Sequence, residues 1–345
     1  MGRTALFLVM GLGMGMSAIS FNISNTTERA LENNYSYYKY MYARNLARTA
    51  IHAALRGFDR NTDPDTTKRV SFASGYFGIT SARYSATPRD TIRMTAQGWF
   101  ADTSYLIYTT LYRSTKPFPS INSAIGIRAT PVTFNISGNP QIDGSNYDLT
   151  GTNLIGSGDV AGVATMNAVD SLSASLALGS NVLGSPPISV DTSTIDPLPF
   201  LEEYKLNADY VFNTPGTYAS SQTWGSAGNP VIVYCNAGDD PTFSIKFSGG
   251  VIGYGILIIR GNLEFNGSFK FFGLVIVDGM NTQVKLGGGG TPQITGGIVV
   301  AGNAGAVIGL NGSGSSAKVR YSSQALANAK NIGKLRYYTI IDWYE

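Results

Sequence analysis

Residues that could perform chemistry are few in this sequence, and they lie far apart. The single histidine, His52, and the single cysteine, Cys235, cannot form a Ser-His-Asp triad, a histidine or cysteine metal cluster, or a disulfide framework within one chain. Four acids are candidates for the paired carboxylates of a glycosidase or lyase, or for a calcium site: Asp239, Asp240, Glu264 and Asp278. Their positions in turns and on outward-facing strand positions predict no catalytic residue, no metal site and no cofactor.

Charge and composition narrow the classes of partner. The net charge is only +3, but residues 1–116 carry 14 Lys and Arg against 7 Asp and Glu, while residues 117–345 carry 11 against 15. The basic residues are spread along the chain instead of forming a patch, which argues against a nucleic-acid partner. With 41 glycines and 14% charged residues, the chain is expected to be rich in strands and turns.

The N-terminal segment predicts one long assembly or membrane helix over residues 1–57. Residues 5–21 are uncharged, and such a run of about 17 residues is near the lower limit for crossing a membrane. Gly11 and Gly15 form a pair with the spacing that lets helices approach closely. Two interpretations stay open: this tip packs against identical helices, or it is a plain membrane anchor. The apolar residues expected at the contact are Leu6, Leu8 and Ile19.

Further along, an apolar and aromatic stripe at spacings of three and four continues the same helix to Gly57. The stripe residues that we expect to contact neighbouring helices or a larger partner are Leu31, Tyr35, Tyr38, Tyr42 and Leu46. At a rise of about 1.5 Å per residue, the helix would be about 80 Å long.

Residues 68–116 predict a small antiparallel sheet packed against the base of the helix. The three expected strands are residues 76–84, 91–100 and 104–112, with turn patterns between them. Residues 59–68 are expected to be a polar linker.

Residues 117–345 have a different pattern, in which glycine-framed aliphatic strands recur. Three of them cover residues 255–261, 273–279 and 297–302. This recurrence predicts a right-handed parallel β-helix or solenoid. Residues at about 150–228 predict an irregular excursion with little regular structure, apart from a modest helical pattern over residues 196–208. The fold class expected for the whole chain is therefore α+β.

Several motifs resemble those of type IV pilin-like proteins joined to a solenoid. The helix ends on an alanine-rich stretch over residues 43–55, and a phrase over residues 134–144 and the ending over residues 321–345 are also similar. The resemblance implies a subunit of an extracellular filament on a bacterial cell surface, inserted in the inner membrane before assembly. Its partners would be identical subunits and the inner-membrane secretion or pilus assembly machinery. Pilins typically have Glu at the fifth mature position, where this chain has Ala5 counted from Met1 or Phe7 counted from a cut after Gly2.

Three hypotheses from different classes remain. The first is a structural subunit of a pilus-like filament, with its solenoid displayed outward. The second is a membrane-anchored surface adhesin or carbohydrate-binding protein, with a surface or polysaccharide ligand. The third is a solenoid carbohydrate-active enzyme, which would need acids gathered in one groove.

Overall fold

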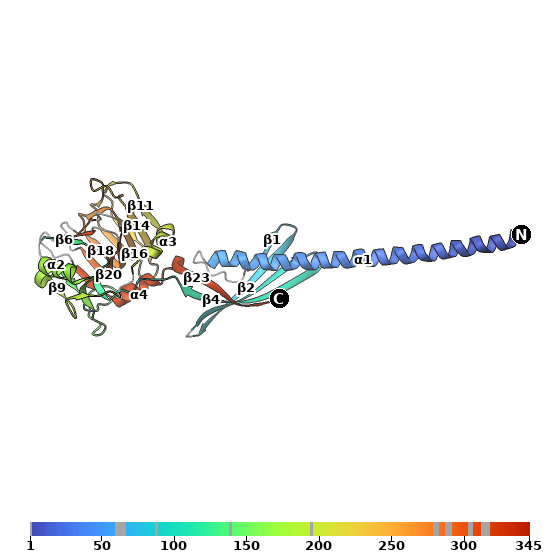
Figure 1. Ribbon diagram of the computed structural model, residues 1–345, viewed down its shortest axis with the longest axis horizontal. Helices are drawn as coiled ribbons and strands as arrows, with labels where there is room; N and C mark the ends of the chain where they lie inside the picture. The colour runs from blue at the N-terminus through green and yellow to red at the C-terminus, as the bar shows by residue number, and fades with distance from the viewer. Residues whose placement is uncertain are drawn as a thin grey trace. The chain divides into compact units, whose positions relative to one another are not determined.

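The computed structural model divides the chain into two compact units, and each is described by itself (Figure 1). It describes residues 2–58, 67–86, 89–137, 140–193, 196–278, 283–286, 292–302, 306–311 and 318–345. The first unit contains Met1–Ser114 and Tyr337–Glu345, and the second contains Thr115–Arg336.

Helix α1 (Gly2–Phe58) confirms the predicted long N-terminal helix. Its 57 residues contain no proline, and they give a length of roughly 85 Å at the usual rise per residue. Burial is confined to its last third, where one face carries Ala43, Leu46, Ala47, Ala50, Ile51 and Ala54. Four of these six side chains are alanines, so the helix backbone can lie close to whatever it packs against.

An antiparallel sheet covers this end of α1. Its strands lie in the order β1 (Thr67–Phe72), β2 (Gly75–Ala86), β3 (Arg89–Phe100), β4 (Thr103–Thr115) and β23 (Arg336–Tyr344). The first four strands pair antiparallel along the chain.

The side chains of the sheet that face α1 form one apolar core with it. This core includes Phe77, Ile79, Ile92, Met94, Ala96, Ile107 and Leu111. Helix and sheet approach so closely at Gly98 that a Cβ atom there would lie 2.1 Å from the carbonyl oxygen of Ala43. The expected packing of a small sheet on the base of the helix is therefore confirmed.

Two strands of this sheet were missed by the sequence analysis. Strand β1 begins at Thr67, inside the stretch expected to be a linker. Strand β23 lies in the region assigned to the solenoid, but it joins the antiparallel sheet beside β4. Its residues Tyr338 and Trp343 pack against the core that α1 and the sheet share. The assignment of all of residues 117–345 to one solenoid is thus corrected, because these aromatic side chains find their apolar partners in the first unit.

The second unit consists mainly of two parallel sheets. The larger sheet contains β5 (Ser123–Ile127), β7 (Gln141–Asp143), β8 (Ala161–Thr165), β9 (Val182–Leu183), β10 (Ile188–Val190), β11 (Tyr210–Phe212), β13 (Gln222–Trp224), β14 (Val231–Asn236), β16 (Val251–Arg260), β18 (Phe269–Asp278), β20 (Gln293–Val300) and β22 (Lys318–Tyr321). The smaller sheet contains β6 (Val132–Ser137), β12 (Gly216–Tyr218), β15 (Ser244–Phe247), β17 (Asn262–Phe265), β19 (Gln283–Leu286) and β21 (Ala306–Asn311). The helices that accompany them in the described ranges are α2 (Ala168–Leu178), α3 (Leu198–Leu206) and α4 (Ser323–Lys330).

From β14 to β22 the chain visits the two sheets alternately. Each strand is parallel to the strand that precedes it in the same sheet, as β16 is to β18 and β18 to β20. Leu257 pairs with Val275, which pairs with Ile298, so the three glycine-framed strands stack in register as predicted. Such pairing is what a solenoid requires, while the right-handed coil itself stays a prediction.

A ladder of three glycines bends the long strands. Gly255, Gly273 and Gly296 lie opposite one another and have φ of 123°, 142° and 138°, a region that side chains rarely adopt. A Cβ atom at Gly273 would lie 2.0 Å from the carbonyl oxygen of Gly255. On the N-terminal side of its glycine, β16 pairs with β13, and on the C-terminal side it pairs with β14. Strand β20 likewise pairs first with β22 and then with β5. The three glycines therefore mark the position along the long strands at which β16 and β20 change their neighbouring strands.

The segment expected to be an irregular excursion is more regular than predicted. Strand β8 pairs with β5, and β10 pairs with β8, so this segment extends the larger sheet. Helix α2 begins after Asn167, whose side chain accepts a hydrogen bond from the amide of Asp170. The predicted helical pattern over residues 196–208 is confirmed as α3. The strands of this segment were not predicted because they are short and their buried residues are small, as in the fully buried Ala-Gly-Val-Ala-Thr run of β8.

Candidate functional site

The N-terminal part of α1 presents a long apolar surface that none of the described residues covers. Leu6, Phe7, Leu8 and Val9 are 63%, 72%, 65% and 68% exposed. Among the described residues, α1 is the helix that passes the test of length and hydropathy for crossing a membrane, and none of its most apolar window is buried. Folded monomers rarely leave so large an apolar surface in water, which points to a membrane or a partner.

The two glycines of the tip contact nothing else in the described part of the chain. A Cβ atom at Gly11 or Gly15 would meet no atom within 4 Å. By contrast, a Cβ atom at Gly98 would collide with α1. If Gly11 and Gly15 have a packing function, the surface that needs their small size lies outside this chain.

The structure separates the predicted contact residues into two groups. The exposed group is available to a partner and comprises Leu6, Leu8, Ile19, Leu31, Tyr35 and Tyr38. Tyr42 is half-buried, with its ring 4.3 Å from that of Phe100. Leu46 is buried between α1 and the sheet of its own chain, so this side chain cannot reach a neighbouring helix. The free surface of α1 therefore ends near Tyr38, whose ring also touches Phe100 at 5.8 Å.

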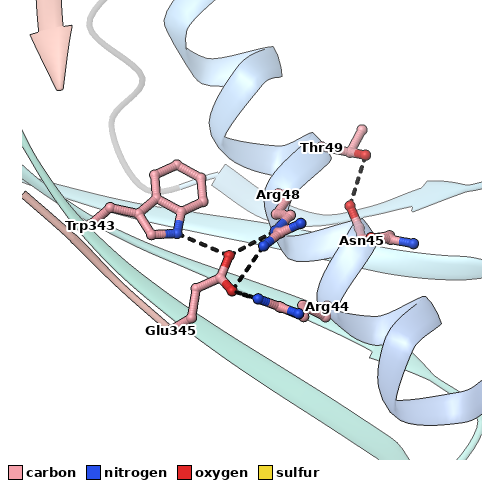
Figure 2. A network of polar contacts seen from close by, with 6 residues as sticks. All are labelled: Arg44, Asn45, Arg48, Thr49, Trp343 and Glu345. Atoms are coloured by element: carbon pink, nitrogen blue, oxygen red, sulfur yellow. Dashed lines mark hydrogen bonds and ion pairs between the residues drawn. The ribbon is translucent and has the colours of Figure 1, made fainter. Parts of the chain in front are cut away.

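Where α1 meets the sheet, a polar network holds the helix to the segment that follows β23 (Figure 2). The carboxylate of Glu345 accepts hydrogen bonds from Nε of Arg44 at 2.7 Å, from Nε of Arg48 at 2.7 Å and from Nη2 of Arg48 at 2.9 Å. Arg44 also pairs with it through Nη2. The indole N–H of Trp343 donates to the same carboxylate at 2.9 Å. One acid is thus shared by two cations that lie one turn apart on α1.

The electrostatic effect on this acid is large. Hydrogen bonds from Arg48 and then from Arg44 and Trp343 lower the pKa of the Glu345 carboxyl to about 2, although partial burial alone would raise it. Its side chain is only 13% exposed. At neutral pH the carboxylate is therefore ionised and neutralises part of the charge of the two arginines.

This network was not predicted from the sequence. The sequence indicates only the two cations of the network, because Arg44 and Arg48 are four residues apart and so lie on one helix face. Their partner follows about 300 positions later, and nothing local to Glu345 indicates which helix it contacts. A separate ion pair joins Lys39 to Asp102, with 2.7 Å between Nζ and Oδ1.

The four candidate catalytic acids each have a partner within the fold, and Asp239 and Asp278 belong to one charge network with Arg260 and Lys205. The carboxylate of Asp239 lies 2.6 Å from Arg260, that of Glu264 lies 3.2 Å from Lys246, and that of Asp278 lies 2.9 Å from Lys205. Asp240 accepts hydrogen bonds from the amide and hydroxyl of Thr242, within a turn. Three of the acids therefore form ion pairs, and the fourth stabilises a turn.

Other chemistry-bearing residues are isolated. Within the described ranges, no group of three or more His, Cys, Asp and Glu residues could hold a metal ion. His52 is exposed on α1. Cys235 is buried in β14, and burial raises the pKa of its thiol. Neither residue lies in an arrangement with a second reactive group among the contacts described above.

Comparison with known proteins yields little sequence similarity. No protein-family model matches the chain, and neither does any curated protein. Among solved structures, the crystal structure of the competence-associated pilin ComZ from Thermus thermophilus is similar to 89% of this chain and 97% of its own, with 12% sequence identity and a TM-score of 0.26. At that score, the two structures cannot be treated as sharing one fold.

Proposed function

We propose that the chain is a structural subunit of an extracellular type IV pilus-like filament. The observation that carries the proposal is the apolar surface of α1, which is continuous from Ala5 to Phe21 and is left uncovered by the described part of the chain. Identical helices packed side by side would cover that surface, with Gly11 and Gly15 allowing close contact. Before assembly, the same surface would lie in the inner membrane, from which the assembly machinery extracts it.

Two features of the first unit support a helix that projects from a fixed base. The sheet buries α1 from Ala43 to Ala54, and the carboxylate of Glu345 ties down Arg44 and Arg48. These two cations within the buried stretch are therefore paired inside the chain. The free part of the helix can then enter an apolar bundle while its base stays with the sheet.

A charge in the apolar tip tests the proposal. Leu8→Lys is expected to abolish filaments, because an unpaired ammonium in an apolar bundle costs several kcal/mol. Leu154→Lys is a matched control, since Leu154 in the second unit is 62% exposed against 65% for Leu8. Electron microscopy of filaments sheared from expressing cells gives the yield. Normal filament yield from Leu8→Lys would contradict the proposal.

The alternative is a surface adhesin that α1 anchors in a membrane. It differs in outcome, because an anchored monomer would stay in the detergent-extracted membrane fraction and form no filaments. For both alternatives, we propose that the protein acts by presenting a binding surface and that it has no hydrolytic or lytic activity. Polysaccharide cleavage that disappears in Glu264→Gln or Asp278→Asn would instead favour the enzyme.

A further inference from the structure

A pocket of about 350 Å³ lies on the antiparallel sheet, within the first unit. Its lining comes from β3, β4 and β23: Arg93, Met94, Thr95, Tyr108, Thr109, Thr110, Asp342 and Tyr344. Binding sites for small molecules have volumes of about 300 to 1,000 Å³. This pocket is therefore at the small end of that range, which suits one or two small rings.

Strand alternation shows which face of the sheet bears the pocket's polar side chains. Ile92, Met94 and Ala96 of β3 pack in the core shared with α1. Their neighbours Arg93 and Thr95 therefore point to the opposite face. On β4, the residues that pair with these two in the register are Thr110 and Tyr108. On β23, Trp343 packs against the core, so Asp342 and Tyr344 on either side of it point away from α1.

The polar groups of the pocket suit a neutral ligand that has many hydroxyl groups. Arg93 supplies donors, Asp342 supplies acceptors, and the hydroxyls of Thr95 and Thr110 can do either. Because one cation and one anion line the same small space, a phosphate or carboxylate would meet repulsion as well as attraction. An entirely apolar ligand would use none of these donors and acceptors.

The aromatic groups add a second requirement. Tyr108 is 52% exposed and Tyr344 is 65% exposed, which is high for rings that usually bury most of their area. Each ring offers a flat apolar surface beside polar groups. A sugar ring has matching chemistry, since it has a face of C–H groups and a rim of hydroxyls.

The wall formed by β23 is fixed before any ligand binds. The hydroxyl of Thr109 donates a hydrogen bond to the carbonyl oxygen of Asp342 at 2.8 Å. Trp343, between the two wall residues, is held by the carboxylate of Glu345. A wall that is already ordered loses less conformational entropy when a ligand binds.

From these observations we infer that the pocket is a binding site for a neutral saccharide, of one or two rings. Tyr108 and Tyr344 stack on the sugar, and Arg93 and Asp342 bind its hydroxyls. The inference does not depend on filament assembly, because the pocket is complete within one chain.

Saturation-transfer NMR and titration on the full chain test the inference. The chain is dispersed in a zwitterionic detergent without a sugar headgroup, and the probes are methyl glycosides of glucose, galactose, mannose and N-acetylglucosamine, together with inorganic phosphate. We expect at least one glycoside to bind, and phosphate not to compete. Tyr108→Ala and Tyr344→Ala should each weaken binding about tenfold, equivalent to about 1.4 kcal/mol. Thr95→Val should also weaken it while preserving the shape of the side chain.

A matched control lies on the same strand as Tyr344. Tyr337 is 43% exposed on β23 but does not line the pocket, so Tyr337→Ala should bind as the unchanged chain does. Failure of all four glycosides to bind would overturn the inference. Equal binding by the Tyr108→Ala and Tyr344→Ala variants would also overturn it, since the sugar would then lie elsewhere, and tighter binding of phosphate would identify an anion site instead.

Discussion

Replacing Glu345 with Gln should destabilise the first unit at neutral pH and have little effect in strong acid. The ordinary pKa of this carboxyl is near 4.5, and the network lowers it to about 2. A lowered pKa means that the carboxylate stabilises the folded state above about pH 5 and that this contribution disappears as the pH falls toward 2. The shift alone corresponds to about 3 kcal/mol. Because water and salt screen a network at the surface, we expect about 1 to 2 kcal/mol at pH 7.

The measurement is urea unfolding of the detergent-dispersed chain at pH 7, 4 and 2.5. Hydrogen exchange of β23 and of residues 43–54 of α1 assigns the loss to the first unit. The relevant quantity is the difference between the unchanged chain and Glu345→Gln at each pH, since other acids titrate in both proteins. Glu202→Gln is a matched control, because Glu202 is 82% exposed and its partner Lys205 keeps Asp278. A difference below about 0.5 kcal/mol at pH 7, or one that does not shrink in acid, would refute the reasoning.

Two substitutions of glycine test the packing. Gly98→Ala should destabilise the first unit by about 1 to 3 kcal/mol, because its Cβ would lie 2.1 Å from a carbonyl oxygen of α1. Thermal unfolding checks this against Gly228→Ala, where the added Cβ would meet nothing within 4 Å. Gly273→Ala should cost the second unit at least about 2 kcal/mol, since it combines an unfavourable φ with a clash. Gly216→Ala has a similar φ of 149° with no clash. An equal loss of stability in both variants would therefore show that backbone strain, and not the contact between β16 and β18, is responsible.

The parts of the fold that sequence could predict are those whose pattern is local and long. The proline-free helix and the strands β2, β3 and β4 follow from hydrophobic periodicity alone. The repeated aliphatic strands also revealed their register, because one phrase recurs along the chain. Short strands such as β9, with two residues, are too brief to show a period.

The sequence could not show which elements α1 and β23 contact. The predicted stripe was followed at spacings of three and four toward Gly57, yet the buried face of α1 runs through Ala47, Ala50 and Ala54. Alanines give a weak hydrophobic signal, and only the sheet determines which of them are covered. In the same way, β23 is rich in aromatic and aliphatic residues, but its sequence cannot say that its neighbour in the sheet is β4. The candidate pocket and the Glu345 network both depend on that pairing, so neither could be predicted.

The position of the second unit in the chain has a consequence of its own. Strand β4 ends at Thr115 and its neighbour in the sheet, β23, begins at Arg336. The amide of Lys116 donates to the carbonyl oxygen of Leu335 at 2.7 Å, so the chain enters and leaves the unit at one point. For the sheet, more than 200 residues thus amount to an insertion in a hairpin, which folded proteins tolerate well. A different domain could therefore be inserted at this junction without altering the strands of the first unit.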